Sequence, residues 1–278
     1  MQKNSKNLFN LKNKIILITG GSGYLGSEFS FAVSDMGAIP VVLDKNKKSI
    51  NLLKNKFFRK KKEGSFYFID INDENEVNNL IKQIIKKYQK IDCLINSAAY
   101  TMNNMLKKNN IFERFEKYDF ELWKQSLEGN LSGIFVVTKS VVKYMLKRKT
   151  GSIINIASDV GIISPDHRIY EPDKNNNYKG VNFNIPASYP VAKSGIISLT
   201  RYLATYWAKS GIRVNCISPT GVYKNQNKKF VKKLSERIPL GRMAKSHEIN
   251  GAVIFLCSSA SSFDTGHNRV VDGGRTIW

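Results

Sequence analysis

The segment Lys14-Ile-Ile-Leu-Ile-Thr-Gly-Gly-Ser-Gly-Tyr-Leu-Gly26 sets the fold class of this chain. Residues 14–19 are a continuous apolar run, which is typical of a parallel strand buried on both faces. Glycines at positions 20, 23 and 26 follow at once, and residues 27–34 have the length of a helix that ends near Gly37. A strand, a glycine-rich turn and a helix in this order predict the start of a βαβ unit.

The same alternation continues along the whole chain. Further strands are predicted at 39–43, 65–69, 91–95, 151–157, 212–217 and 269–271. Helices are predicted at 47–59, 74–88, about 120–147, from about Ser188 with that serine as N-cap, and at about 248–258. Repeated βαβ units predict an α/β fold: a Rossmann-like, doubly wound parallel sheet of about seven strands with helices on both faces. No linker divides residues 1–278, so we expect a single domain.

Composition narrows the class of partner. The 44 Lys and Arg residues against 22 Asp and Glu give a formal net charge of +22. The lysines are spread over the whole chain among Asn and Ile rather than gathered with aromatic residues, so nucleic-acid binding is not predicted. The three cysteines are far apart in apolar surroundings, which indicates buried thiols in a reducing compartment. No apolar run is long enough to span a membrane, and we expect a soluble, cytoplasmic protein without a membrane partner.

The glycines and Asp44 predict a dinucleotide site. Small residues between a strand and a helix let the backbone approach a pyrophosphate, and the helix N-terminus supplies positive partial charge. Asp44 ends the second predicted strand, where its carboxylate can accept hydrogen bonds from the adenosine ribose and repel a 2′-phosphate. We therefore expect NAD, while Lys45 and Lys47 leave NADP open.

Tyr189 and Lys193 are four residues apart, so they lie on one face of a helix. An ammonium group close to a phenol favours the phenolate and would lower the tyrosine pKa toward the range of a general acid or base. On its own, this spacing is more typical of an ordinary surface pair.

Together these residues resemble the classical short-chain dehydrogenase/reductase family, from about Lys14 to Gly274. The motifs that carry the resemblance are Thr19 to Gly26, Asp70-Ile71, Asn96-Ser-Ala-Ala99, Asn130, Ser158, Tyr189, Lys193, Pro219 to Val222, and Val271-Asp-Gly-Gly274. In this chain Tyr24 stands where the family usually has its second glycine, and Pro190 directly follows the catalytic tyrosine.

The resemblance implies roles for these residues. Tyr189 would be the general acid/base, and Lys193 would lower its pKa and hold the nicotinamide ribose. Ser158 would hydrogen-bond the substrate oxygen, and Asn130 would position a water that relays protons. The implied coenzyme contacts are Gly20, Ser22, Gly23, Tyr24, Leu25, Gly26, Asp44, Asp70, Ile71, Asn96, Ala98, Tyr189, Lys193, Pro219, Thr220 and Val222. The implied reaction is hydride transfer between nicotinamide and a secondary alcohol or ketone, without a metal, in a homo-dimer or homo-tetramer.

A polar insertion at about 164–187 separates Ser158 from Tyr189 by 31 positions, which is more than the family typically has. Both ends of the insertion are catalytic, so His167, Arg168 and Tyr170 are candidate substrate contacts. A lid and a solvated loop both remain open. Its polar character favours a hydroxyl-rich or anionic small molecule, such as a sugar derivative. The insertion also resembles the subgroup of flagellin-modification and nonulosonic-acid pathways.

The sequence is compatible with two other functions. One is an NADPH-dependent 3-oxoacyl or acetoacetyl reductase, which would need an apolar pocket. The other is a non-catalytic protein that senses a cofactor or binds nucleic acid, against which the complete set of Asn130, Ser158, Tyr189 and Lys193 argues.

Overall fold

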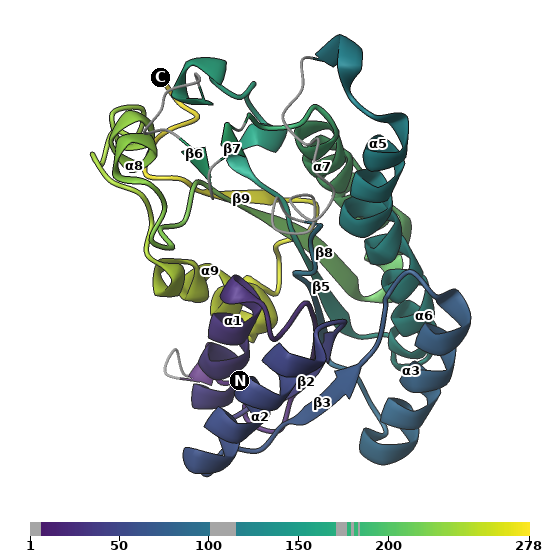
Figure 1. Cartoon of the computed structure of the whole chain (residues 1–278). Helices are drawn as coiled ribbons and strands as arrows, with labels where there is room; N and C mark the ends of the chain where they lie inside the picture. Colours follow the sequence, from purple (N-terminus) through teal and green to yellow (C-terminus); the bar gives the residue numbers. More distant parts are fainter. Residues whose placement is uncertain (1–6, 101–114, 171–176, 179–180, 183) are drawn as a thin grey trace.

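A seven-stranded parallel sheet lies at the centre of the molecule (Figure 1). The computed structural model describes residues 7–100, 115–170, 177–178, 181–182 and 184–278. The strands are β1 (Ile15–Thr19), β2 (Ile39–Asp44), β3 (Ser65–Phe68), β4 (Cys93–Asn96), β5 (Gly151–Ile156), β8 (Ile212–Pro219) and β9 (Asn268–Val271). Their order is β3-β2-β1-β4-β5-β8-β9, and each neighbouring pair is parallel. The predicted doubly wound sheet is thereby confirmed.

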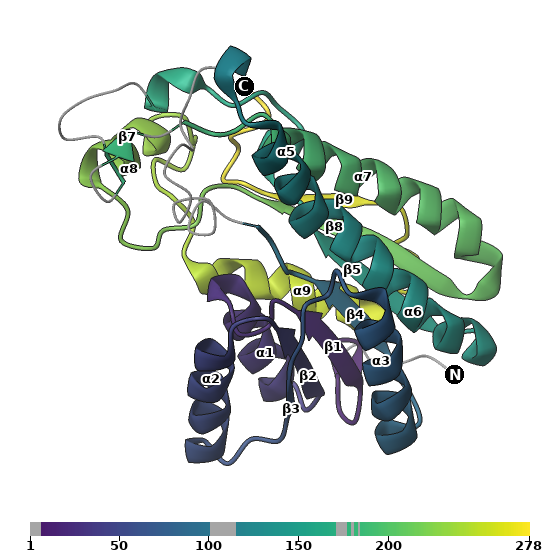
Figure 2. The same cartoon turned by 45° about the vertical axis from the view of Figure 1, so that its right-hand side comes forward.

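Helices cover both faces of the sheet (Figure 2). They are α1 (Tyr24–Asp35), α2 (Lys47–Arg59), α3 (Glu74–Tyr88), α5 (Phe120–Leu127), α6 (Gly133–Arg148), α7 (Ser188–Trp207), α8 (Lys228–Ser235) and α9 (Asn250–Cys257). Alternate residues of one strand serve the two faces. In β1, Ile16 and Ile18 pack with α1 and α9, whereas Ile15 and Leu17 pack with α3 and α6. Within the described residues, no helix combines the length and apolar character needed to cross a membrane.

The direction of winding changes at β1. The chain moves from β1 outward through β2 and β3 on one side, and then crosses to β4 and β5 on the other. In sheets of this kind, ligands bind beyond the carboxyl ends of the strands where the order reverses. We therefore expect a ligand to bind near the residues that follow β1 and β4.

The observed helices differ from the predicted ones in two places. Helix α1 begins at Tyr24 rather than at residue 27, so Gly26 lies in its first turn. The helix predicted at about 120–147 is not continuous: a π-helical turn, Glu128–Ser132, separates α5 from α6. Helix α7 begins at Ser188 as predicted, but its N-cap is Ala187 and the predicted serine cap is wrong.

The described parts of the insertion lie with α8 and the chain's C-terminal end beyond the carboxyl edge of the sheet (Figure 1). It contains a short 3₁₀ helix, His167–Tyr170, and a small antiparallel ribbon formed by β6 (Asn177–Tyr178) and β7 (Val181–Asn182). The residues that flank the insertion belong to the central fold, since Ser158 follows β5 and Tyr189 lies in the first turn of α7.

Candidate active site

The predicted site residues collect at the carboxyl edge of the sheet because each follows or ends a parallel strand. Gly20 follows β1, Asp44 ends β2 and Asn96 ends β4. Ser158 comes two residues after β5, and Thr220 directly follows β8. The fold thus brings together residues that are up to 200 positions apart in sequence.

The glycine loop fits tightly against its surroundings. Gly20 has φ +60°, and a Cβ at this position would lie 2.6 Å from Cα of Ala98 at the end of β4. A Cβ on Gly26 would overlap the carbonyl oxygen of Gly20 and lie 2.7 Å from Cα of Gly21. Glycine is required at both positions, because any larger residue would push the loop away from the sheet.

Helix α1 presents an N-terminus suited to a diphosphate. Its N-cap is Gly23, which offers no side chain to the amide groups of the first turn. Uncapped amides and the helix dipole together favour an anion at this position. Tyr24, the residue that replaces the usual glycine, starts the helix and directs its hydroxyl to the carbonyl oxygen of Tyr223, 2.5 Å away.

Asp44 is fixed at the adenosine end of the predicted coenzyme site. Its carboxylate accepts hydrogen bonds from the backbone amides of Ser22 (3.2 Å) and Asn46 (3.0 Å). Lys45, which left NADP open, instead forms an ion pair with Asp70 at 3.6 Å. Beside Asp70, the side chain of Ile71 is buried and contributes an apolar surface.

Thr220 carries a polar group without a partner. Within the described residues, its Oγ1 is buried and has no hydrogen bond. Such atoms are rare in folded proteins and usually mark a place where a ligand or water binds. Because Thr220 and Val222 were predicted to face the nicotinamide, this orphan hydroxyl agrees with a coenzyme site. The residues present therefore fit a dinucleotide, both at the glycine loop and at this opposite end.

Ser158, Tyr189 and Lys193 form the candidate catalytic group. The Lys193 side chain is buried, donates a hydrogen bond to the carbonyl oxygen of Ile156 at 2.9 Å, and lies 5.5 Å from the ring centroid of Tyr189. Ser158 is buried in extended backbone, and its hydroxyl donates to Asp159 at 2.9 Å. Lys193 is buried and Tyr189 is partly buried, so the reading as an exposed surface pair is wrong.

The expected effect of Lys193 on Tyr189 is not what the geometry produces. Burial, together with the charge of Asp159, raises the pKa of Tyr189 to about 12, although its contact with Ser158 acts in the opposite direction. Burial likewise lowers the pKa of Lys193 to about 8. The prediction of a lowered tyrosine pKa is wrong for this state of the protein, because Lys193 is directed to a backbone carbonyl and a carboxylate lies nearby.

Asn130 explains the break between α5 and α6. Its side-chain amide donates to the carbonyl oxygens of Ser126 (2.8 Å) and Tyr100 (3.1 Å), and its Oδ1 accepts from the amide of Tyr100 (3.2 Å). In an α-helix, the carbonyl of Ser126 would bond to the backbone amide four residues later, which is that of Asn130. The side chain takes over this carbonyl, and a π-helical turn results. The predicted water relay through Asn130 stays a prediction.

The three candidate substrate contacts of the insertion have different surroundings. His167 and Arg168 are exposed, and the Arg168 guanidinium pairs with Asp166 at 2.9 Å. Tyr170 is partly buried, and its ring centroid lies 5.8 Å from that of Phe230 on α8. Burial raises the pKa of Tyr170, with Tyr189 and Asp159 among the groups that act on it. Tyr170 is therefore near enough to Tyr189 and Asp159 to interact with them electrostatically. Residues 171–176, 179–180 and 183 of the predicted loop lie outside the described residues.

Two functional candidates were missed by the sequence. Asp159 and Arg275 form a buried ion pair, and Asp159 also accepts the hydroxyl proton of Ser158. The position of Asp159 next to Ser158 was the only available signal. Arg275 gave none, because it lies 116 residues further along the chain.

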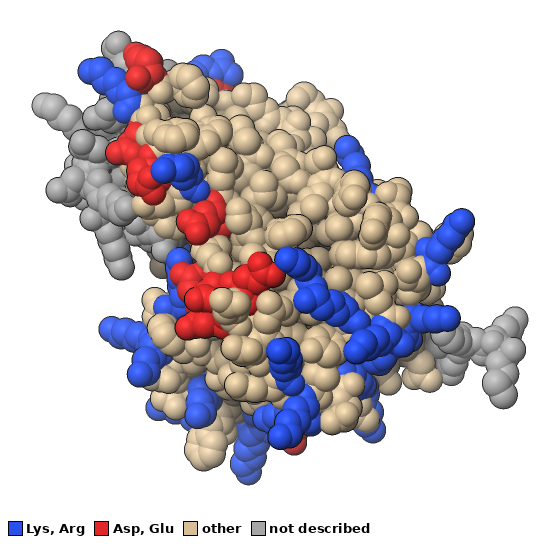
Figure 3. Space-filling view, turned by 90° about the vertical axis from the view of Figure 1, so that its right-hand side faces the viewer, with Lys and Arg blue, Asp and Glu red and all other residues tan. Residues whose placement is uncertain are grey.

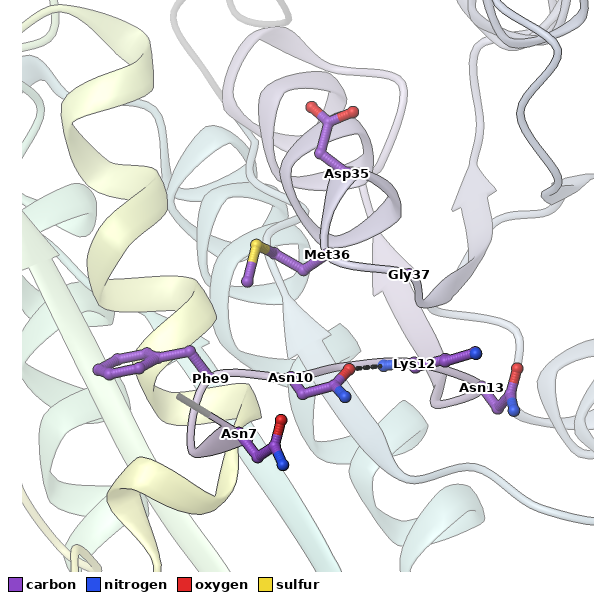
Figure 4. Close-up of a pocket in the computed structure, with 8 residues that line it drawn as sticks. All are labelled: Asn7, Phe9, Asn10, Lys12, Asn13, Asp35, Met36 and Gly37. Atoms are coloured by element: carbon purple, nitrogen blue, oxygen red, sulfur yellow. Dashed lines mark hydrogen bonds between the residues drawn. The ribbon is translucent and has the colours of Figure 1, made fainter. Parts of the chain in front are cut away.

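A depression elsewhere on the surface is separate from this site. Figure 4 shows it between the segment before β1 and the end of α1. Its lining residues are Asn7, Phe9, Asn10, Lys12, Asn13, Asp35, Met36 and Gly37. These positions adjoin the amino ends of β1 and β2, so the depression lies at the opposite edge of the sheet from the catalytic group.

Known sequence families match nearly the whole chain. The family described as short chain dehydrogenase matches residues 14–170, and the one described as enoyl-(acyl carrier protein) reductase matches residues 177–276.

Individual relatives differ in the activity that they are named for. A 3-oxoacyl-(acyl-carrier-protein) reductase of Thermotoga maritima is 30% identical over 96% of this chain and 99% of its own. An NAD-dependent glycerol dehydrogenase of Listeria innocua is 29% identical over 97% and 96%. A post-translational flagellin modification protein A of Campylobacter coli is 30% identical over 95% and 98%.

Solved structures agree with the fold. A short chain dehydrogenase from Leptospira borgpetersenii with bound NAD+ superposes with a TM-score of 0.83, at 32% identity, over 100% of this chain and 98% of its own. A gluconate 5-dehydrogenase from Burkholderia cenocepacia in complex with NADP and tartrate gives a TM-score of 0.82 at 25% identity, over 99% and 100%.

Proposed function

Because the chain belongs to the short-chain dehydrogenase family, we propose that it transfers a hydride between NAD and a secondary alcohol or ketone of a small, hydroxyl-rich substrate. The observation that carries this proposal is the meeting of Ser158, Tyr189 and Lys193 at the carboxyl edge of the sheet, beside the tightly fitted glycine loop. We further propose that residues 1–278 act as one dinucleotide-binding domain.

The coenzyme would bind along the carboxyl edge of the sheet. The amides at the start of α1 would bind the diphosphate, and Asp44 would bind the adenosine ribose. We favour NAD over NADP because Asp44 is held in place by two backbone amides and Lys45 is paired with Asp70. Once bound, the coenzyme supplies the hydride chemistry at its nicotinamide ring.

The chain's own residues would handle the proton. A phenol with a pKa near 12 remains protonated at neutral pH, so Tyr189 is a proton donor to the developing alkoxide when a ketone is reduced. Ser158, whose own proton is directed to Asp159, would accept a hydrogen bond from the resulting hydroxyl group. Lys193, charged at neutral pH and next to the Tyr189 ring, would stabilise the phenolate that proton donation leaves behind.

A polar substrate is supported by the surroundings of the insertion. Asp166 pairs with both Arg168 and Arg237, and this charged cluster lies close to Tyr170. The relatives named for glycerol, gluconate and flagellin modification support the same class. We therefore propose a polyol, a sugar or a sugar acid derivative, including the flagellin-modification type of substrate.

The test combines binding with turnover. Purified protein is titrated with NAD(H) and NADP(H) by nicotinamide fluorescence and is then assayed with a panel of polyols, sugar acids and their ketones. We expect NAD(H) to bind more tightly, and Tyr189→Phe to lose about 10²- to 10⁴-fold in turnover with unchanged coenzyme affinity. Tyr67→Phe, on the edge strand β3, is the matched control and should keep full activity. Full turnover by Tyr189→Phe would overturn the assigned mechanism.

A second candidate is an NADPH-dependent 3-oxoacyl reductase. It is favoured by the similarity to the Thermotoga maritima reductase and to the family that matches residues 177–276. Turnover of a 3-oxoacyl thioester with NADPH, faster than that of any polyol with NAD, would select this function over the first.

We also propose a homo-oligomer. Helices α5, α6 and α7 expose the aromatic side chains of Phe120, Phe135, Tyr202 and Tyr206, and the last two stack on each other with ring centroids 5.8 Å apart. Figure 3 shows a wide area without charged groups on this side of the molecule. Exposed aromatic side chains in an uncharged area of this kind commonly mark protein contacts. Light scattering should give a dimer or tetramer, and Tyr202→Glu with Tyr206→Glu should yield a monomer.

A further inference from the structure

A buried ion pair lies directly behind the catalytic serine. Asp159 and Arg275 are 2% and 7% exposed, and the Arg275 guanidinium donates to Oδ2 of Asp159 at 2.5 Å. The other carboxylate oxygen, Oδ1, accepts the hydroxyl proton of Ser158 (2.9 Å) and the amide of Val160 (2.7 Å). Both oxygens of the Asp159 carboxylate are therefore hydrogen-bonded. Through Arg275, the C-terminal segment of the chain is linked to the candidate active site.

Arg275 is held in position by a compact turn. The carboxylate of Asp272 accepts from the amides of Gly274 (2.9 Å) and Thr276 (2.7 Å), and its carbonyl oxygen accepts from the amide of Arg275 (3.3 Å). Gly273 and Gly274 both have positive φ, which allows the chain to reverse at this point. The turn therefore directs the guanidinium inward, toward Asp159, rather than into solvent.

We propose that Asp159 and Arg275 are positioning residues: the Asp159 carboxylate orients the Ser158 hydroxyl, and Arg275 neutralises that carboxylate beside Tyr189. This inference rests on the proposed function, since it assigns the pair to the same reaction. A serine hydroxyl has one proton and two lone pairs, so a fixed acceptor behind it sets where the lone pairs point. Neither residue needs to touch the substrate.

The ion pair of Asp159 and Arg275 influences the pKa of Tyr189 electrostatically. Among the residues that the structure describes, the charged and titratable groups near its phenol are Asp159, Lys193 on α7, Tyr170 of the insertion and, behind Asp159, Arg275. An unpaired carboxylate in this place would oppose formation of the phenolate, and the guanidinium cancels part of that field. The two members of the pair should therefore shift the titration of Tyr189 in opposite directions.

The experiment compares variants of Asp159 and Arg275, for which opposite shifts are expected. Asp159→Asn keeps an oxygen that can accept the Ser158 proton but removes the charge, so the pH midpoint of kcat/KM should fall by about 1 unit. Arg275→Met leaves the carboxylate unpaired, so the midpoint should rise by a similar amount, and Arg275→Lys should restore it. In the double variant, Asp159→Asn with Arg275→Met, the midpoint should lie between those of the single variants. Equal midpoints, or shifts in the same direction, would overturn the inference.

A matched control separates positioning from stability. Arg148 pairs with the partly buried Asp92 at the amino edge of the sheet, so Arg148→Met should lower the melting temperature without moving the midpoint. Variants that unfold are replaced by the double variant, which buries no unpaired charge.

Tyrosine labelled with ¹³C at Cζ gives a readout that needs no turnover. The Tyr189 signal, identified by its absence in Tyr189→Phe, should show more phenolate at pH 10.5 in Asp159→Asn than in wild type. A wild type that binds NAD but turns over no substrate would defeat the proposed function, and this signal would still decide the inference.

Discussion

The hydroxyl of Tyr24, at the first position of α1, donates a hydrogen bond to the backbone carbonyl oxygen of Tyr223 in the loop after β8, with 2.5 Å between the oxygens. The ammonium of Lys224 lies 4.8 Å from the centroid of the same ring. The two segments belong to opposite ends of the proposed coenzyme site, the diphosphate loop and the nicotinamide loop. The tyrosine that replaces the usual glycine thus connects them directly.

We expect Tyr24→Phe to release the coenzyme faster. Loss of one neutral hydrogen bond contributes about 0.5 to 1.5 kcal/mol, which corresponds to roughly a 2- to 10-fold increase in the dissociation rate. Stopped-flow fluorescence of bound NADH would measure it. Tyr223→Ala is the matched control, because the acceptor is a backbone carbonyl that alanine retains. An unchanged rate in Tyr24→Phe would show that the contact does not restrain the coenzyme.

Gly26 should tolerate no side chain, whereas Gly251, a glycine of α9, should tolerate one. A Cβ at Gly26 meets backbone atoms of Gly20 and Gly21, which cannot rotate away, so Gly26→Ala should destabilise the fold by about 1 to 3 kcal/mol and abolish coenzyme binding. Gly251 in α9 has no atom within 4 Å of a built Cβ. Gly251→Ala should leave binding intact and add about 0.5 to 1 kcal/mol of stability. Thermal unfolding with and without NAD would compare the two variants.

Lys193 should make stability rise with pH in a defined window. Its pKa is about 8 in the folded protein and 10.5 ordinarily, so between these values the unfolded chain holds a proton that the folded chain lacks. Raising the pH from 8 to 10.5 therefore favours folding, by an amount of about 3 kcal/mol at most. Lys193→Met lacks this contribution, and its melting temperature should fall relative to wild type over the same window. Parallel pH profiles for the two proteins would contradict the lowered pKa.

Arg237 should control the docking of the insertion on α8. Its guanidinium contacts Asp166, which also binds Arg168, and these charges hold the pKa of the Asp166 carboxyl well below its usual range. Ile169 packs beneath them with Phe230 and Leu234. We expect Arg237→Met to raise the substrate KM several-fold while the NAD affinity is unchanged.

The exposed pair between Arg242 and Glu248 provides the control for that experiment. Arg242→Met should change neither quantity, because the pair lies in another loop. If Arg237→Met lowers stability but leaves KM unchanged, the insertion does not shape the substrate site.

The strands were predictable because both faces of the sheet are covered. Apolar residues dominate both 14–19 and 151–157, with the unbroken run Ile15 to Ile18 in the first, and the observed β1 and β5 lie within these limits. Gly37 marked the end of α1 for a local reason as well, since its φ of +84° is one that glycine adopts readily. These predictions from neighbours in sequence succeeded, whereas the start of α1 and the serine cap of α7 were predicted wrongly.

The features that the sequence missed depend on distant partners. The side chain of Asn130 bonds to the backbone of Tyr100, 30 residues earlier, and Asp159 binds Arg275, 116 residues later. The spacing of Tyr189 and Lys193 predicted their contact correctly. It could not predict that the ammonium would bond to the carbonyl of Ile156 or that burial would dominate both pKa values.

The π-helical turn at 128–132 also restricts how this chain can change in length. Such a turn accommodates one residue more than an α-helical turn, so α6 is rotated by roughly 100° from the orientation that an unbroken helix would give it. Deleting a single residue here would restore regular α-helical hydrogen bonding, yet it would turn Val137 and Val141 away from the sheet against which they pack. Insertions and deletions should therefore be excluded from this turn, even though it is the least regular part of its helix.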